Sequence, residues 1–140
     1  MEYFAFQLHI TDECDQRCQH CYIFSENGSI KLKEMSLSQI TAVLDNCEEM
    51  CEKLKRLPYF YITGGDPILH GDFWELMSLF KTRKIPFSIL GNPFHLTDEV
   101  CSLLKQHGCE RYQLSIDGLC ETHDSIRMSG SFDTTLDKIE

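Results

Sequence analysis

Three closely spaced cysteines are the residues of this chain best suited to chemistry. They are Cys14, Cys18 and Cys21, in the pattern C-x3-C-x2-C. Three thiolates on one short loop can bind three irons of a [4Fe–4S] cube and leave the fourth iron without a protein ligand. An open metal position is what a substrate or cofactor needs in order to be activated. The spacing therefore predicts redox chemistry on a bound small molecule.

A zinc site is the main alternative for these cysteines. His9 or His20 can supply a fourth ligand beside the three thiolates, which would make the chain a zinc-stabilised binding module. Structural zinc sites usually show two C-x2-C pairs, or a Cys/His pair further along the chain. Only one C-x2-C pair occurs near this motif. The cluster interpretation is therefore favoured over zinc.

Length, composition and charge indicate one globular domain, residues 1–140. The chain has 140 residues, 42% of them hydrophobic, and a net charge of −9. An acidic chain without a Lys/Arg block is poorly suited to binding nucleic acid or a membrane surface, so we expect neither partner. The first ten residues are too short and too mixed for a signal peptide or a spanning helix. We therefore expect a cytoplasmic location.

Eight cysteines are a high count for a chain of this length. Without an export signal, metal binding or catalysis explains them better than disulfides do. Cys47 and Cys51 lie one helical turn apart beside Met50 and Leu54, a pattern typical of small apolar core residues. The cysteines outside the motif are too scattered to suggest a second cluster: Cys47, Cys51, Cys101, Cys109 and Cys120.

Short apolar runs alternate with amphipathic stretches, which predicts four strand–helix units. The expected strands are residues 3–10, 59–63, 87–90 and 111–116. The expected helices begin after Ser36, at Asp72 and Glu75, which can cap the second helix, after Thr97, which caps the third, and near Ser131. Ser36 and Gln39 have capping-box spacing. Gly108 suits the position that follows the end of the third helix.

The alternation of strands and helices predicts an α/β fold with parallel strands and right-handed crossovers. Ligands in such folds gather at the carboxyl ends of the strands. The unusual residues of this chain follow the ends of the predicted strands: the three cysteines, Gly64-Gly65-Asp66, Asn92, and Ser115 with Asp117. The sequence therefore predicts one shared site at one edge of the sheet.

Four such units cannot close an eight-stranded barrel. The fourth strand would be left as an exposed edge, and the last predicted helix meets the chain end at Glu140. We therefore expect a piece of a longer protein, poorly soluble when isolated.

The cysteine motif resembles the signature of the radical S-adenosylmethionine (SAM) enzymes. His20 precedes the last cysteine and Tyr22 follows it. The resemblance implies that Cys14, Cys18 and Cys21 bind one [4Fe–4S] cluster and that SAM chelates the fourth iron. It also implies that an electron from a donor such as flavodoxin or ferredoxin cleaves SAM to methionine and a 5′-deoxyadenosyl radical. That radical removes a hydrogen atom from the substrate.

Gly64-Gly65-Asp66-Pro67 resembles the family's GGEP motif, with Asp in place of Glu. Two glycines let the backbone approach a ligand closely, and the carboxylate of Asp66 can accept hydrogen bonds from an amine. The same composition is also typical of an ordinary tight turn. The resemblance implies that Gly64, Gly65 and Asp66 contact SAM, while the shorter Asp66 side chain departs from the family pattern.

Ser115-Ile116-Asp117-Gly118 resembles the S-[IL]-D-G segment of the family's peptide-modifying branch. The resemblance implies that Ser115 and Asp117 lie near the polar groups of the SAM ribose. Arg127 lies in a downstream stretch that also resembles this branch, and a guanidinium suits the carboxylate of SAM.

His20, Tyr22 and Asn92 complete the predicted cofactor contacts. By resemblance, His20 lies near the adenine. Asn92 occupies the place where relatives often show Thr-Asn-Gly, although Gly91-Asn92-Pro93 departs from that pattern.

The resemblance extends over most of the chain and implies the N-terminal portion of a partial (βα) barrel, with about four βα units before closure. The implied function is a radical SAM enzyme acting on a ribosomally made peptide or a small molecule. A zinc-stabilised binding module and an inactive remnant that still binds cluster or SAM are the alternatives.

Overall fold

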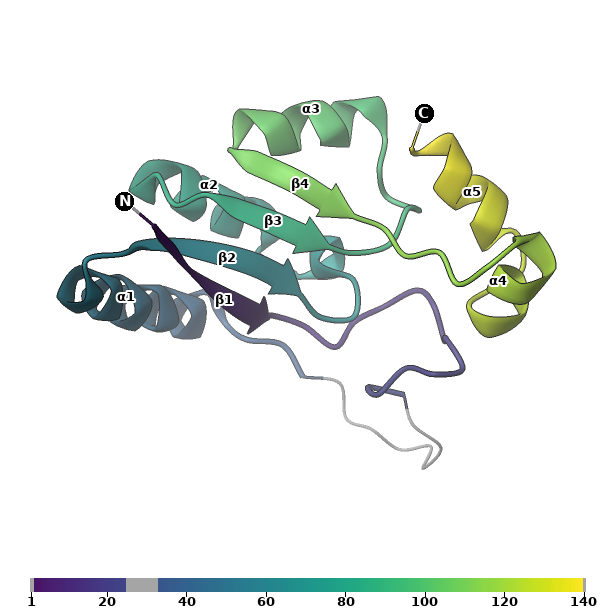
Figure 1. The fold of residues 1–140 in the computed structure, drawn as a ribbon, viewed down its shortest axis with the longest axis horizontal. Coiled ribbons are helices and arrows are strands. Elements are labelled where there is room, and N and C mark those ends of the chain that lie inside the picture. The colour runs from purple at the N-terminus through teal and green to yellow at the C-terminus, as the bar shows by residue number, and fades with distance from the viewer. Residues whose placement is uncertain (1, 25–32, 140) are drawn as a thin grey trace.

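A parallel four-stranded sheet, in the order β1-β2-β3-β4, forms the centre of the molecule (Figure 1). The computed structural model describes residues 2–24 and 33–139. The elements are β1 (Tyr3–His9), α1 (Leu37–Leu54), β2 (Leu57–Thr63), the 3-10 turn η1 (Pro67–Leu69), α2 (Phe73–Arg83), β3 (Phe87–Leu90), α3 (Asp98–Gln106), β4 (Cys109–Gln113), α4 (Cys120–Ile126) and α5 (Ser131–Asp137). Helices α1, α2 and α3 connect successive strands, which confirms the α/β prediction.

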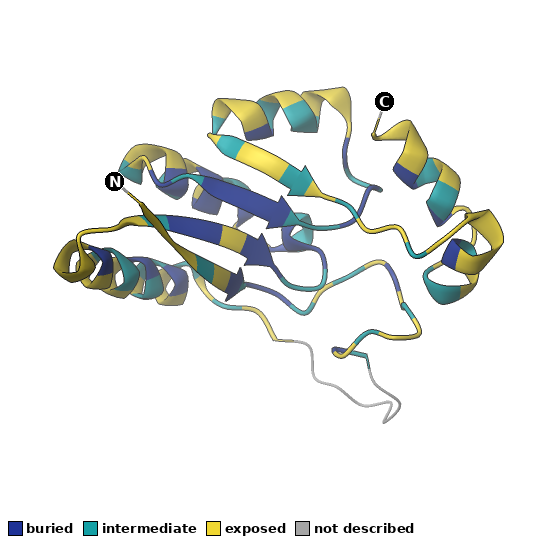
Figure 2. Ribbon diagram, in the orientation of Figure 1, coloured by how far each residue is buried: buried dark blue, intermediate teal, exposed yellow. Residues whose placement is uncertain are grey.

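One face of the sheet packs against these helices to form the core. Alternate strand residues such as Phe60, Ile62 and Phe87 are fully buried there, whereas Tyr61 is exposed on the opposite face. Figure 2 shows this burial in the two central strands. Phe80 of α2 joins the two strands because its ring centroid lies 5.5 Å from that of Phe60 and 4.9 Å from that of Phe87.

The predicted helix caps are largely confirmed. The Ser36 hydroxyl accepts the Gln39 amide N–H at 3.3 Å, and the Gln39 side chain accepts the Ser36 N–H at 2.8 Å, which completes a capping box. The Thr97 hydroxyl accepts the Val100 N–H at 3.2 Å. Asp72 occupies the N-cap position of α2, but its side chain makes no capping hydrogen bond, so that part of the prediction is wrong.

Gly108 follows the end of α3 with a φ of +89°, and its N–H donates to the Lys105 carbonyl at 3.0 Å. Glycine adopts this left-handed conformation without the steric cost that a β-carbon imposes. The expected role of Gly108 is therefore confirmed.

The strand predictions differ most at the fourth strand. The structure confirms residues 87–90, ends the first strand at His9, and extends the second upstream to Leu57. Strand β4 runs Cys109–Gln113, not 111–116, because its ladder with β3 pairs Phe87 with Cys109 and ends at Leu90 and Gln113. Ser115 and Ile116 therefore lie in the loop beyond the sheet.

Helix α4 was not predicted from the sequence. Its seven residues carry no apolar stripe, and its N-cap residue Leu119 provides no side-chain hydrogen bond. Tertiary contacts stabilise it instead: His123 is fully buried, and its Nδ1 accepts the Asp117 N–H at 3.2 Å. The His123 ring also meets Phe132 of α5 edge-on, with centroids 5.7 Å apart.

The outer edge of β4 has no strand partner among the described residues. Glu110, Arg111 and Gln113 are exposed along this strand. Charged and polar side chains on an open edge oppose pairing with another chain. Poor solubility of the isolated chain stays a prediction.

Phe80→Ala is expected to lower the free energy of unfolding by about 3–5 kcal/mol, because it removes a fully buried ring that packs on two strands. Urea unfolding monitored by circular dichroism measures this change. Leu119→Ala is the matched control: Leu119 is 81% exposed, so the change should stay within about 0.5 kcal/mol. Similar losses for both variants would contradict this view of the core.

Candidate functional site

The three cysteines of the motif line one cavity of about 260 Å³ at the carboxyl end of the sheet. All three thiols are free and half-buried. The loop after β1, which carries them, lies beside the ends of the strands (Figure 1). The segments after β2, β3 and β4 and the end of α4 supply the remaining lining residues. The predicted residues that line the cavity with the cysteines are His20, Tyr22, Gly64, Gly65, Asn92, Ser115 and Arg127. The structure therefore brings together residues from all four predicted strand ends.

The turn after β2 holds the chain that leads into the cysteine loop. The Gly65 N–H donates to the Thr11 carbonyl at 2.8 Å, and the Asp66 N–H donates to the Glu13 carbonyl at 2.7 Å. A β-carbon on Gly65 would lie 2.2 Å from the Glu13 carbonyl oxygen, and one on Gly64 would lie 2.3 Å from the Thr11 carbonyl oxygen. The two glycines are therefore required by the close approach of two backbones.

The far end of the cysteine loop is anchored on both sides. The Tyr22 hydroxyl lies 3.0 Å from Nδ1 of His9, and Nε2 of His9 lies 2.7 Å from an Asp12 carboxylate oxygen. The Gln19 backbone N–H donates to the Ile126 carbonyl of α4 at 2.8 Å, and its side chain donates to the Ser125 carbonyl at 2.6 Å. Helix α4 thus helps to fix the loop.

Cys14 and Cys18 differ in their polar neighbours. Asn92 Nδ2 donates to Cys14 Sγ at 3.2 Å, whereas Arg127 Nη1 lies 3.9 Å from Cys18 Sγ. Burial raises the pKa of both thiols, and the Arg127 charge partly opposes this effect at Cys18. Coordination to a metal deprotonates a thiol outright, so the raised pKa values describe the thiols without iron.

Arg127 and Asp117 form an ion pair beside the cavity. Nε of Arg127 donates to one Asp117 oxygen, and His20 Nε2 lies 3.6 Å from the other. The hydrogen bond from Arg127 holds the pKa of Asp117 below its ordinary value. Arg127 lines the cavity. Asp117 does not line it, and its ion pair holds the Arg127 side chain in place.

Asp66 lies behind the cavity wall and not on it. Its side chain is fully buried and accepts the Asn92 N–H at 3.4 Å. It shares the single Tyr112 hydroxyl proton, at 3.5 Å, with the Asn92 carbonyl, which lies closer to that hydroxyl at 3.1 Å. Its Oδ2 has no hydrogen-bond partner among the described residues. Burial raises the pKa of Asp66 to about 6. A contact between Asp66 and a bound ligand stays a prediction.

The spacing of the three sulfurs bears on whether one zinc ion can bind them. Two sulfurs on one zinc lie at most about 4.6 Å apart, twice the Zn–S bond length. Among the described residues, the group whose donor atoms all lie within 4.8 Å of one another is Asp15, Asp66 and His95, and it does not include the cysteines. Both ring nitrogens of His9 are already engaged. As the side chains lie, the three sulfurs are not all within reach of one zinc ion.

Sequence reasoning missed Asp15 and His95. Asp15 Oδ2 lies 2.9 Å from Nε2 of His95, and Asp15 Oδ1 accepts a hydrogen bond from Asn92 Nδ2 at 2.9 Å. Asp15 directly follows the first cysteine and His95 follows the third strand. Both residues follow predicted strand ends, which is the feature of the sequence that could have indicated a place in the site. The residues next to each of them in the sequence do not indicate that the two side chains meet.

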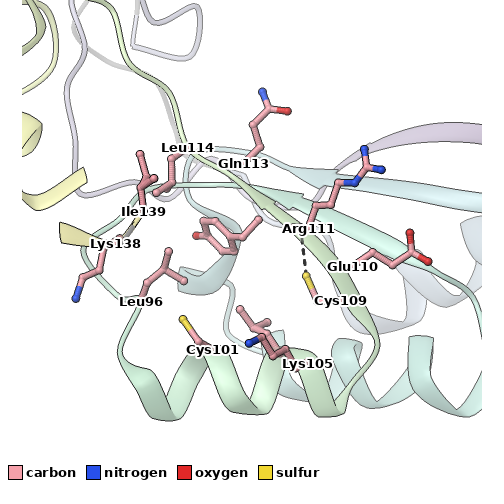
Figure 3. Close-up of a pocket in the computed structure, with 12 residues that line it drawn as sticks. Leu96, Cys101, Lys105, Cys109, Glu110, Arg111, Gln113, Leu114, Lys138 and Ile139 are labelled. Carbon is pink, nitrogen blue, oxygen red and sulfur yellow. Dashed lines mark hydrogen bonds between the residues drawn. The ribbon is translucent and has the colours of Figure 1, made fainter. Parts of the chain in front are cut away.

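A larger cavity of about 570 Å³ lies between α3, β4 and the end of the chain beyond α5 (Figure 3). Its walls include Leu96, Leu104, Leu114 and the thiol of Cys109. Burial raises the pKa of Cys109 to about 11, so the thiol stays protonated and unreactive near neutral pH. The lining of this cavity also includes the charged residues Lys105, Glu110, Arg111 and Lys138.

Comparisons with known proteins agree with this geometry. The family model described as the radical SAM superfamily matches residues 8–140. Mycofactocin maturase MftC of Mycolicibacterium smegmatis is 30% identical over 134 residues, which cover 94% of this chain and 32% of the relative. An AdoMet-dependent heme synthase of Methanosarcina barkeri is 29% identical over 133 residues, with 94% and 36% coverage. The chain thus spans about a third of the length of these curated relatives.

A solved structure shares the fold. Streptococcus suis SuiB, bound to its precursor peptide SuiA, superposes with a TM-score of 0.71 over 98% of this chain and 29% of that chain. The sequence identity is 16%, so this similarity concerns the fold alone. Across the described residues, no helix is long and apolar enough to cross a membrane.

Gly65→Ala is expected to destabilise the fold by about 1–3 kcal/mol, because the new β-carbon would overlap the Glu13 carbonyl. The displaced loop should also bind less iron after anaerobic reconstitution. Gly71→Ala is the matched control, since its β-carbon would meet a flexible Glu34 side chain at 3.3 Å. Urea unfolding and iron analysis measure both effects, and equal behaviour of the two variants would contradict the close-approach argument.

Asp66→Asn is expected to raise the free energy of unfolding of the iron-free protein at neutral pH. The folded state holds the pKa of Asp66 at about 6, above the ordinary value of 3.8, so it binds a proton more readily than the unfolded state. The wild type should therefore lose stability as pH rises from about 4 through 6, by at most about 3 kcal/mol. Urea unfolding across this window should show the gap between variant and wild type opening with pH.

The exposed Asp137→Asn serves as the control for that experiment. It should reproduce the pH dependence of the wild type. A stability difference between Asp66→Asn and wild type that is constant across the window would contradict the raised pKa of Asp66.

Proposed function

Because the chain belongs to the radical SAM superfamily, we propose that its cysteine cavity holds a [4Fe–4S] cluster and SAM for radical modification of a substrate. The observation that carries this proposal is the convergence of Cys14, Cys18 and Cys21 on one cavity whose other walls come from the remaining strand ends. Enzymes of this superfamily use that cluster together with SAM. The three thiols would supply the iron ligands.

Held by Cys14, Cys18 and Cys21, a cluster with SAM would supply one-electron reductive cleavage of SAM and hydrogen-atom abstraction from the substrate. The chain's own residues bind and orient the reactants and exclude water. Ile23 and Leu90 contribute apolar wall to the cavity. Gly64 and Gly65 expose backbone there, because they carry no side chain that could cover it.

Polar residues of the cavity would orient SAM. Nε of Arg127 is engaged by Asp117 and Nη1 lies 3.9 Å from Cys18 Sγ, so Nη2 would be the nitrogen that meets the carboxylate of SAM. Ser115 lines the cavity and would contact the ribose, and His20 and Tyr22 would lie along the adenine side. Asp66 lies behind the cavity wall, so its carboxylate, whose Oδ2 has no partner among the described residues, would have to turn toward the cavity to meet the SAM ammonium group.

We favour a peptide as the substrate. Two observations support this choice: the Ser115-Ile116-Asp117-Gly118 segment, and the identity of about 30% to mycofactocin maturases. SuiB, which shares the fold, was solved with a precursor peptide. A heme synthase of similar identity makes a porphyrin-type small molecule the second candidate. We further propose a cytoplasmic location, with flavodoxin or ferredoxin as the electron donor.

Anaerobic reconstitution of the full chain with iron and sulfide tests the proposal. The wild type should bind about four irons per chain and release 5′-deoxyadenosine when SAM and dithionite are added. Cys18→Ser should lose both properties because it removes one of three iron ligands. Cys120→Ser is the matched control, since Cys120 is exposed and outside the cavity, and it should retain both.

The alternatives give different results. Stoichiometric zinc that persists under reductant would establish the binding module. A protein that binds the cluster and SAM but forms no 5′-deoxyadenosine would be an inactive remnant.

A further inference from the structure

We propose that Asn92 is a positioning residue for Cys14: its carboxamide donates an N–H···S hydrogen bond that orients the Cys14 sulfur and raises the reduction potential of the cluster. A pair formed by Asp15 and His95 holds the carboxamide in place. This inference rests on the proposed function, because it takes Cys14 as an iron ligand.

The Asn92 carboxamide is bound by two acceptors at once. Its Nδ2 lies 3.2 Å from Cys14 Sγ and 2.9 Å from Asp15 Oδ1. A carboxylate and a thiolate can only accept hydrogen bonds, so the nitrogen of the carboxamide must face them and the oxygen cannot. Each of the two N–H groups of Nδ2 therefore has one partner, and Asn92 itself is buried.

The backbone of Asn92 is held from the opposite side. Its N–H donates to Asp66 Oδ1 at 3.4 Å, and its carbonyl accepts the Tyr112 hydroxyl at 3.1 Å. A β-carbon on Gly91 would lie 2.7 Å from Asp66 Oδ1, so the turn after β3 packs tightly against that carboxylate. The position of the Asn92 side chain is therefore set by the turn and not by a mobile loop.

Asp15 connects this carboxamide to His95. One Asp15 oxygen accepts from Asn92, and the other lies 2.9 Å from Nε2 of His95. Because a carboxylate only accepts hydrogen bonds, the Nε2 of His95 is the donor in this contact. Asp15 directly follows Cys14, so the contact ties the first cysteine of the loop to the turn after β3 at two points.

The three cysteines are not equivalent in this respect. Among the described residues, Cys14 accepts from a side-chain N–H at 3.2 Å, whereas Cys18 has the Arg127 guanidinium at 3.9 Å and donates its own S–H to the Gln16 carboxamide oxygen at 3.7 Å. Hydrogen bonds to a ligating sulfur withdraw electron density from it and stabilise the reduced cluster, and residues that hold a ligand in place tune a metal site. Asn92 should therefore make the cluster easier to reduce.

Redox titration of the reconstituted full chain, followed by EPR without SAM, tests this inference. Asn92→Leu keeps similar bulk but removes the N–H groups, so the reduction potential should shift to a more negative value while the iron content stays that of the wild type. Asn46→Leu is the matched control, because Asn46 carries the same carboxamide, is exposed on α1 and lies outside the cysteine cavity. It should leave the potential unchanged.

Asn92→Asp provides a second variant that keeps the shape of the side chain and replaces both N–H groups by an acceptor. It should lower the potential as well, or lose iron while its unfolding curve matches the wild type, and either result supports the positioning role.

Two results would contradict the role of Asn92 or the cluster assignment. Full iron content with an unshifted potential in Asn92→Leu would overturn the role of Asn92 and leave the cluster assignment intact. A wild type that takes up no iron would overturn the cluster assignment, and the inference about Asn92 with it.

Discussion

The candidate site depends on a pair of backbone hydrogen bonds that join the turn after β2 to the chain entering the cysteine loop. They connect Gly65 to Thr11 and Asp66 to Glu13, immediately before Cys14. Because two backbones meet without intervening side chains, the loop leaves the sheet in one direction and its thiols face the cavity. The Gly-Gly pair thus has a structural task that does not depend on any ligand.

Three carboxylates near the cavity differ in the groups that compensate their negative charge. Asp117 is paired with Arg127, and Asp15 accepts from Asn92 and His95. Asp66 is buried with two long hydrogen bonds, so its charge is poorly compensated. In a chain of net charge −9, these arrangements limit the repulsion that thiolates and a bound carboxylate would otherwise meet.

Strands and helices with strong local signals were predictable. Residues 87–90 form a buried strand between clear turns, and the capping box at Ser36 marks the start of α1. Strand β4 was misplaced because its ends are set by pairing with β3, and helix α4 was missed because the burial of His123 stabilises it. Propensity within one segment carries no information about either interaction.

The sequence alone determined the spacing of the three thiols, the glycine pair and the alternation that places strand ends along one edge. These features are local, and stereochemistry over a few residues dictates them. Only the tertiary structure decided that Asn92 meets Cys14, 78 positions away, and that Gln19 binds Ser125, 106 positions away. Contacts of this kind depend on how the crossover helices set neighbouring strand ends against each other, which no local pattern encodes.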